Sequence, residues 1–115
     1  MAGKLRSAFQ DLPFREQVIS ATTNSAVVDI GSTEGVSAMQ IEWHSGSSVN
    51  FTVSLEVSNN KINWVTIPLS SFNMTTNTGV LMIDPINSGA EFLRINVVVT
   101  TGSATMSAFF NGKSR

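Results

Sequence analysis

The sequence contains no cysteine and no tyrosine, and it has a single histidine, His44, in 115 residues. Without cysteine the chain can form neither a disulfide nor a thiolate metal site. One histidine cannot build a histidine-rich metal site, and no Ser-His-Asp arrangement can be assembled from the sequence. We therefore expect neither a cofactor nor a bound metal.

Charge is also scarce, since only 13% of the residues are charged and the net charge is −1. Proteins that bind nucleic acids usually carry a strong basic excess, so nucleic acid is not an expected partner. No segment approaches the roughly 20 apolar residues that span a bilayer, and no apolar run of signal-peptide length follows the first residues. We expect a protein that is made in the cytoplasm and has no membrane contact.

The few charges are unevenly placed along the chain. The ends are basic, because residues 1–15 carry three basic side chains against Asp11 alone and residues 113–115 carry two more. The body between them is acidic. This asymmetry predicts terminal segments that contact an acidic surface, such as the body of a neighbouring copy. Simple solubility of the ends is the alternative.

Residues 1–16 differ from the rest of the chain. Leu5, Phe9 and Leu12 have the i, i+4, i+7 spacing of a helical stripe, which Pro13 would end. Two helical turns are marginal alone, so we predict an arm or short helix over 1–16 that lies on a neighbouring subunit. A helix or extended segment on its own domain, or a disordered tail, is the alternative. The contacts assigned to the arm and to the basic tail over 113–115 are Lys4, Leu5, Arg6, Phe9, Leu12, Phe14, Arg15, Lys113 and Arg115.

Residues 17–112 have β character throughout. Apolar residues alternate with polar ones over 36–44 and again over 51–57, which is typical of half-buried strands. Polar and glycine-containing turns are predicted between the strands, among them 45–48 and 101–102. About eight short strands with turns every 8 to 12 residues predict a single antiparallel β-sandwich of jelly-roll or immunoglobulin-like topology.

The stretch 50–68 predicts a hairpin, in which an alternating strand runs through a polar turn into a return strand over 62–69. The run VSLEVSNNKINW (53–64) resembles a strand–S-N-D-G-x-x-W–strand hairpin, and FLRINV (92–97) is similar to the late strand of the same proteins. The proteins that share this hairpin and this late strand are small β-sandwich structural proteins of tailed phages, of the capsid cement or decoration type, and discoidin-like binding modules. The resemblance implies a non-enzymatic sandwich that is displayed on a virion or binds a surface glycan.

The aromatic residues offer a second function. Trp43 continues an apolar inward row and Trp64 follows the hairpin turn, so core packing is favoured for both indoles. If Trp43, His44 and Trp64 instead lay exposed together, they would form a glycan-binding surface.

An enzymatic function is not expected. Glu42 and Glu56 lie on the outward sides of two strands, where a paired-carboxylate site is conceivable. However, 115 residues leave little room for a walled cleft. No phosphate-binding loop, calcium loop or nucleophile elbow occurs.

The sequence thus predicts a structural protein of a bacteriophage virion. The leading hypothesis is a capsid cement or decoration protein that binds capsid protein and copies of itself, with a trimer as the expected oligomer. The alternative is a glycan-binding or adhesin module at a phage tail or a bacterial surface.

Overall fold

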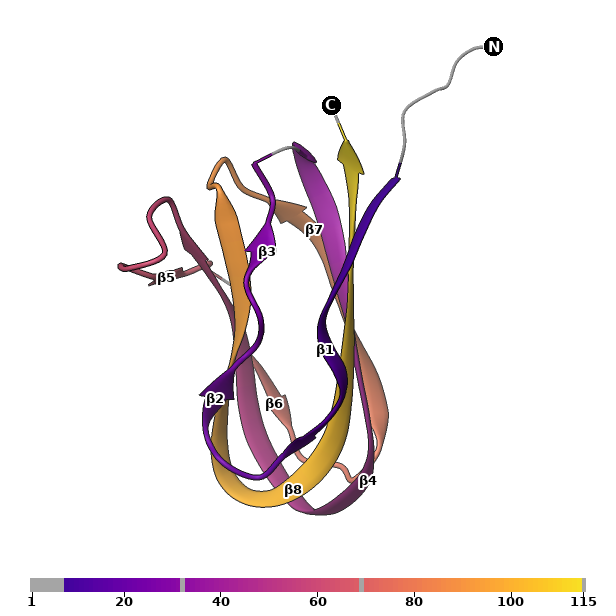
Figure 1. Ribbon diagram of the computed structural model, residues 1–115. Coiled ribbons are helices and arrows are strands. Elements are labelled where there is room, and N and C mark those ends of the chain that lie inside the picture. The colour runs from indigo at the N-terminus through magenta and orange to yellow at the C-terminus, as the bar shows by residue number, and fades with distance from the viewer. Residues whose placement is uncertain (1–7, 32, 69, 115) are drawn as a thin grey trace.

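The computed structural model describes residues 8–31, 33–68 and 70–114, and the regular structure in these ranges is entirely β-strand (Figure 1). Every strand pairing is antiparallel, so the all-β antiparallel prediction is confirmed. No helix in the described ranges could cross a membrane. The strands are β1 (Ala8–Ile19), β2 (Thr23–Asn24), β3 (Val28–Asp29), β4 (Thr33–Ser58), β5 (Val65–Thr66), β6 (Phe72–Met74), β7 (Gly79–Asn87) and β8 (Phe92–Ser114).

Two long strands, β4 and β8, organise the molecule. They pair with each other from Thr33 opposite Ser114 to Ser58 opposite Phe92. Both curve back at the lower end of the molecule in Figure 1, so each contributes one half to each of two facing layers. The β4–β8 register shifts between His44 and Phe51, which is where the strands change layer. One hydrogen-bonded sheet thereby folds over itself into a sandwich.

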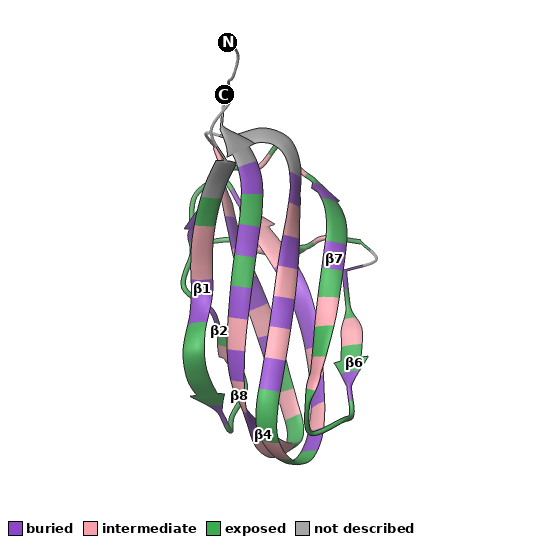
Figure 2. Ribbon diagram, turned by 90° about the vertical axis from the view of Figure 1, so that its right-hand side faces the viewer, coloured by how far each residue is buried: buried purple, intermediate pink, exposed green. Residues whose placement is uncertain are grey.

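The first layer consists of β1, the C-terminal half of β8, the N-terminal half of β4, and β7, side by side in that order (Figure 2). The second layer has the other halves of β8 and β4 at its centre. The short strands β2 and β3 pair with β8 on one side, and β5 and β6 pair with β4 on the other.

The core lies between the layers and follows the predicted alternation. Met39 and Ile41 of the first layer and Phe51 and Leu55 of the second have no exposed surface. Each such side chain contributes about 1.5–3 kcal/mol on burial. Trp43 closes the lower end, where its indole lies against Gly79 so closely that a Cβ there would approach the ring to 2.5 Å.

The turns predicted at 45–48 and 101–102 are bends within the continuous strands β4 and β8, so the prediction that they separate strands is wrong. Ser45, Ser48 and Gly102 have positive φ angles of 55°, 52° and 86°. A Cβ on Gly102 would lie 2.3 Å from the carbonyl oxygens of Ser47 and Ser48. Polar and glycine residues allow either a hairpin or a bend, which is why their pattern does not distinguish the two.

The helix predicted within residues 1–16 is wrong for the part that the structure describes. Residues 8–16 belong to β1, which pairs with β8 and crosses the predicted arm boundary. Pro13 lies where the register shifts, between Asp11 and Phe14, so the missing N–H of proline does not interrupt a regular ladder. Pairing with β8 satisfies backbone N–H and C=O groups of β1. An isolated helix of two turns, in contrast, is only marginally stable in water.

The hairpin over 50–68 is present, but its return strand is only β5. The Ser58 hydroxyl accepts hydrogen bonds from the backbone N–H groups of Asn60 and Lys61 at 3.1 and 2.9 Å. Lys61 takes the left-handed backbone with φ of 63°, which the turn requires. The predicted strand over 62–69 is thus mostly loop, and Ile62 is 78% exposed. The stretch 70–79 contains β6.

Candidate interaction surfaces

The residues predicted to contact a neighbouring subunit divide into four groups. Phe14 lies opposite Ala108 with no exposed surface, so its assignment to a contact with another subunit is wrong. Arg15 is exposed and Leu12 is half-buried. The side chains of Phe9 and Lys113 are outside the description, although their backbones pair within β1 and β8. The remaining assigned residues, Lys4, Leu5, Arg6 and Arg115, lie outside the described residues.

The three residues of the alternative glycan surface do not come together. Trp43 is only 7% exposed, and its Nε1 donates a hydrogen bond to the Thr76 carbonyl oxygen at 2.8 Å. His44 is exposed beside the bend of β4. Trp64 is half-buried and precedes β5, at the opposite end of the second half of β4. The core prediction thus holds for Trp43, and Trp64 is only partly covered.

His44 does join a short polar chain. Its Nε2 lies 3.0 Å from a carboxylate oxygen of Glu16 and its Nδ1 lies 2.8 Å from the Ser45 hydroxyl. The side chains of His44 and Glu16 are 53% and 68% exposed, and a contact so open to water contributes little to stability. The contact links β1 to the bend of β4, while a hydrogen bond from the Glu16 N–H to the Ser107 hydroxyl links β1 to β8.

The two carboxylates considered for a paired site are separated by the fold. Glu42 lies on the outer side of the first layer, opposite Val80 and Ser107, whereas Glu56 lies on the second layer opposite Arg94. The two layers face in opposite directions, so these groups cannot act on one substrate. Among the described residues, no group of three or more histidine and carboxylate side chains could hold a metal ion.

The hairpin is held onto the second layer by two cations. The Arg94 guanidinium stacks 4.2 Å from the centre of the Trp64 ring and donates to Glu56 at 2.7 Å. The Lys61 ammonium lies 4.6 Å from the centre of the Phe92 ring. Such contacts contribute about 0.5–2 kcal/mol. Sequence analysis missed them, because only the pairing of β4 with β8 places Glu56 beside Arg94.

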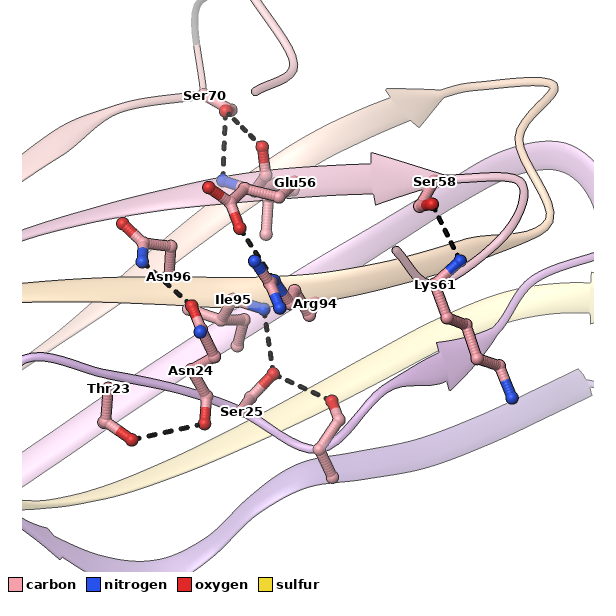
Figure 3. Close-up of polar contacts among 12 residues, drawn as sticks. Thr23, Asn24, Ser25, Glu56, Ser58, Lys61, Ser70, Arg94, Ile95 and Asn96 are labelled. Atoms are coloured by element: carbon pink, nitrogen blue, oxygen red, sulfur yellow. Dashed lines mark hydrogen bonds and ion pairs between the residues drawn. The ribbon is translucent and has the colours of Figure 1, made fainter. Parts of the chain in front are cut away.

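In the second layer, side-chain hydroxyls bond backbone groups of the central strands β8 and β4 next to the short edge strands. The Ser25 hydroxyl accepts a hydrogen bond from the Ile95 N–H at 2.8 Å, and the Thr22 hydroxyl accepts one from the Val99 N–H at 3.0 Å. On the other edge the Ser70 hydroxyl accepts one from the Leu55 N–H at 3.1 Å (Figure 3). These hydroxyl groups occupy backbone donors that the strands of two or three residues leave free. They give the serine and threonine content of the chain a structural role.

The edges of the first layer are formed by long strands, which differ from each other. The edge strand β1 has two register shifts, includes Pro13, and carries a left-handed residue, Glu16, with φ of 49°. Such irregularities keep a strand from pairing further. At the other edge, β7 has its own register shift near the cis peptide Asp84-Pro85, but its first five residues, 79–83, pair regularly with β4. Among the described strands, only β4 pairs with β7.

The same end of β7 carries exposed apolar side chains. Val80 is 66% exposed and Met82 is 51% exposed, both on the outer side of the first layer. Phe109 is 38% exposed and lies two strands away, since Gln40 of β4 is registered with both Met82 and Phe109. We call Val80, Met82 and Phe109 the β7 patch. The apolar run 80–83 predicts a short strand that Asp84-Pro85 ends, and it does not reveal that this strand lies at an edge.

The chain shares its fold with proteins of phage origin. No protein-family model matches the sequence, and no curated protein matches it. The SPBc2 prophage-derived protein YomS superposes with a TM-score of 0.63 at 12% identity, over 97% of this chain and 99% of YomS. The enzymatically active domain of bacteriophage CBA120 tailspike protein 4 superposes with a TM-score of 0.52 at 16% identity, over 98% of this chain and 18% of the tailspike chain.

A third similar structure is the PBSX exported protein XepA, with a TM-score of 0.66 at 13% identity over 93% of this chain. The chain corresponds to 37% of XepA, so the fold also occurs as part of a longer protein. Identities this low establish the fold alone. The predicted resemblance to small β proteins of phages is thereby confirmed at the level of the fold.

Proposed function

We propose that this protein is a non-enzymatic structural component of a phage virion, and specifically a cement or decoration protein that binds capsid subunits and copies of itself. The β7 patch is the observation that carries the proposal. It places three exposed apolar side chains on the outer side of a sandwich whose other edges are short or irregular. The fold shared with phage-derived proteins supports the phage origin.

Charge supports an additional contact through the ends of the chain. Asp84 and Glu42 lie near the β7 patch, on β7 and on the neighbouring strand β4. The basic residues Lys4 and Arg6 precede β1 in the sequence. Opposite charges steer association and fix its orientation more than they add affinity. In this proposal the basic end of one copy contacts the acidic outer surface of a neighbour.

The arm of the proposal is shorter than the sequence predicts. Because Phe14 is part of the core and residues from Ala8 onward belong to β1, we assign this contact to residues 1–7. Seven residues reach at most about 25 Å when extended, which is enough to cross a strand layer. Repeated around a shell, individually weak contacts would add up through multivalency.

The proposal is tested on particles of the phage whose genome encodes the chain. We expect the protein in purified particles at a fixed high copy number, and we expect particles that lack it to release DNA at a lower temperature. Deletion of residues 1–7 should weaken binding to such particles while circular dichroism shows a folded sandwich. Absence of the protein from particles, or unchanged particle stability without it, would refute the proposal.

The fold is also compatible with the alternative function in glycan binding. That function has less support, because the structure separates Trp43 and His44 from Trp64 by the length of the second half of β4. A glycan array that is positive for the wild type and negative for Trp64→Ala would favour this alternative.

A further inference from the structure

We infer that the first five residues of β7, Gly79 to Ile83, form a twofold joint with the same residues of a second copy. The two β7 strands pair antiparallel, and the first layers of the two copies become one continuous sheet. This inference deepens the proposed function, because it assigns the self-contact that the virion role requires to one strand.

The segment Gly79 to Ile83 is an open edge of the first layer. Its residues pair with β4 on one side, and among the described strands none pairs on the other. An open strand edge presents unpaired N–H and C=O groups and invites pairing with another chain. Natural proteins block such edges with charges, proline, bulges or very short strands. The segment reads Gly-Val-Leu-Met-Ile and contains none of these devices.

The other described edges of the two layers are blocked from pairing with a further strand. The strand β1 has two register shifts, Pro13 and the left-handed Glu16. The strands β2, β3, β5 and β6 are two or three residues long. Hydroxyl groups of Ser25, Thr22 and Ser70 occupy backbone donors beside them. Among the described strands, only β7 therefore offers a second copy an edge of five regularly paired residues, and its best-matched partner in that copy is β7 itself.

The segment Gly79 to Ile83 fits the same segment of a second copy. A twofold axis through Leu81 places Val80 opposite Met82 of the second copy, on the outer side, and Gly79 opposite Ile83 of the second copy. Residues opposite each other in an antiparallel pair have their side chains on the same face, so the exposed Val80 and Met82 pack together. No charge lies in the segment, and the axis therefore brings no like charges into contact.

The size of the contact sets its strength. Two strands of five residues bury less than the 1,200–2,000 Å² of a standard stable interface. The pair should therefore be a weak dimer in dilute solution and should be reinforced where many copies are held on one particle. A twofold contact closes on itself, so it yields a dimer, in contrast to the trimer expected from sequence analysis.

Site-directed cross-linking tests the joint directly, because the chain has no cysteine of its own. Val80→Cys and Met82→Cys proteins are mixed at about 1 mM and oxidised mildly. Opposite residues in antiparallel strands have Cβ atoms about 5 Å apart, close to the geometry of a disulfide. We expect the mixed disulfide to form at least about tenfold faster than either self-disulfide.

Val18→Cys is the matched control, because Val18 is 68% exposed, as Val80 is, but lies on the blocked edge β1. A mixture of Val18→Cys with Met82→Cys should cross-link only at the slow collisional rate. Equal rates for both mixtures, or faster self-disulfides than mixed ones, would overturn the Leu81-centred pairing.

A second variant separates pairing from folding. Met82→Lys should abolish the concentration-dependent dimer in sedimentation equilibrium without changing the melting temperature. The control is Val98→Lys, at a 43% exposed position of the second layer, which should leave the dimer intact. A wild-type trimer, or a Met82→Lys protein that still dimerises, would overturn the inference. If the β7 strands do not pair but the protein is found in particles, the inference is overturned and the proposed function stands. If the β7 strands pair but the protein is absent from particles, the proposed function is overturned and the pairing stands.

Discussion

The two layers of the sandwich share their central strands but differ in how their edges are completed. In the first layer the edges are β1 and β7, which pair with the centre through backbone ladders. In the second layer the edge strands are two or three residues long, and side-chain hydroxyls of Thr22, Ser25 and Ser70 complete the hydrogen bonding. These hydroxyls bond N–H groups of the central strands that the short edge strands leave free. The second layer thus ends in strands too short to extend the sheet, whereas the first layer ends in the irregular β1 and in the regular first half of β7.

The outer surfaces of the layers follow the same division. The second layer presents polar pairs, such as Asn24 with Asn96 at 2.9 Å and Thr52 with Asn73 at 3.0 Å. The first layer presents the β7 patch. The first layer thus gathers its exposed apolar side chains in one patch, whereas Val98 of the second layer, which is 43% exposed, lies opposite the polar Thr52.

The largest effect is expected where the first layer depends on apolar burial. Phe14→Ala should lower the free energy of unfolding by about 3–5 kcal/mol, because it removes a fully buried ring that anchors β1 to the core. Urea denaturation measures the change. Arg15→Ala, at the exposed neighbouring position, is the control and should change the stability little. A Phe14→Ala protein with unchanged stability would mean that β1 is an arm after all.

A smaller effect is expected where the second layer depends on side-chain closure. Ser25→Ala should lower the free energy of unfolding by about 1–3 kcal/mol, because the buried Ile95 N–H loses its acceptor. The control is Ser71→Ala, since Ser71 is exposed and the replacement leaves the core intact. Equal stability of the two variants would show that hydroxyl closure contributes nothing to this layer.

The smallest stability effect is expected at the stack of Arg94 on Trp64, which holds the hairpin on the second layer. Arg94→Met should destabilise the protein by about 1 kcal/mol, since it removes the stack on Trp64 and leaves the half-buried Glu56 unpaired. Thermal unfolding followed by circular dichroism measures the loss. Lys61→Met removes the more exposed cation over Phe92 and should cost less. A larger loss for Lys61→Met would reverse this ranking of the two contacts.

The strand content could be predicted from the sequence because alternation reports burial directly. The rows through Met39 and Ile41 and through Phe51 and Leu55 lie in the core as predicted. The connectivity could not be predicted, since Ser45 to Ser48 has the composition of a hairpin turn but forms a bend. A turn and a bend differ in which distant strand supplies the next hydrogen bonds, and that partner is not encoded locally.

The contact surfaces could be predicted only in part. The basic end of the chain was visible as charge, whereas Phe14 was misassigned because it lies within the arm predicted over 1–16, while β1 extends the domain into that segment. The exposure of Val80 and Met82 follows from the position of β7 at an edge. Edge position is a property of the whole sheet, so an apolar run of four residues cannot reveal it.

The contrast between an open and a closed layer is tested most directly by a dilution series followed by two-dimensional ¹H–¹⁵N NMR. Both layers are then observed in one sample, residue by residue. We predict that the amide resonances of Gly79 to Ile83 shift with concentration, while those of Leu55, Ile95 and Val99, whose N–H groups are already bonded to hydroxyls, stay in place. Shifts centred on the second layer, or no shift anywhere up to about 1 mM, would contradict the account.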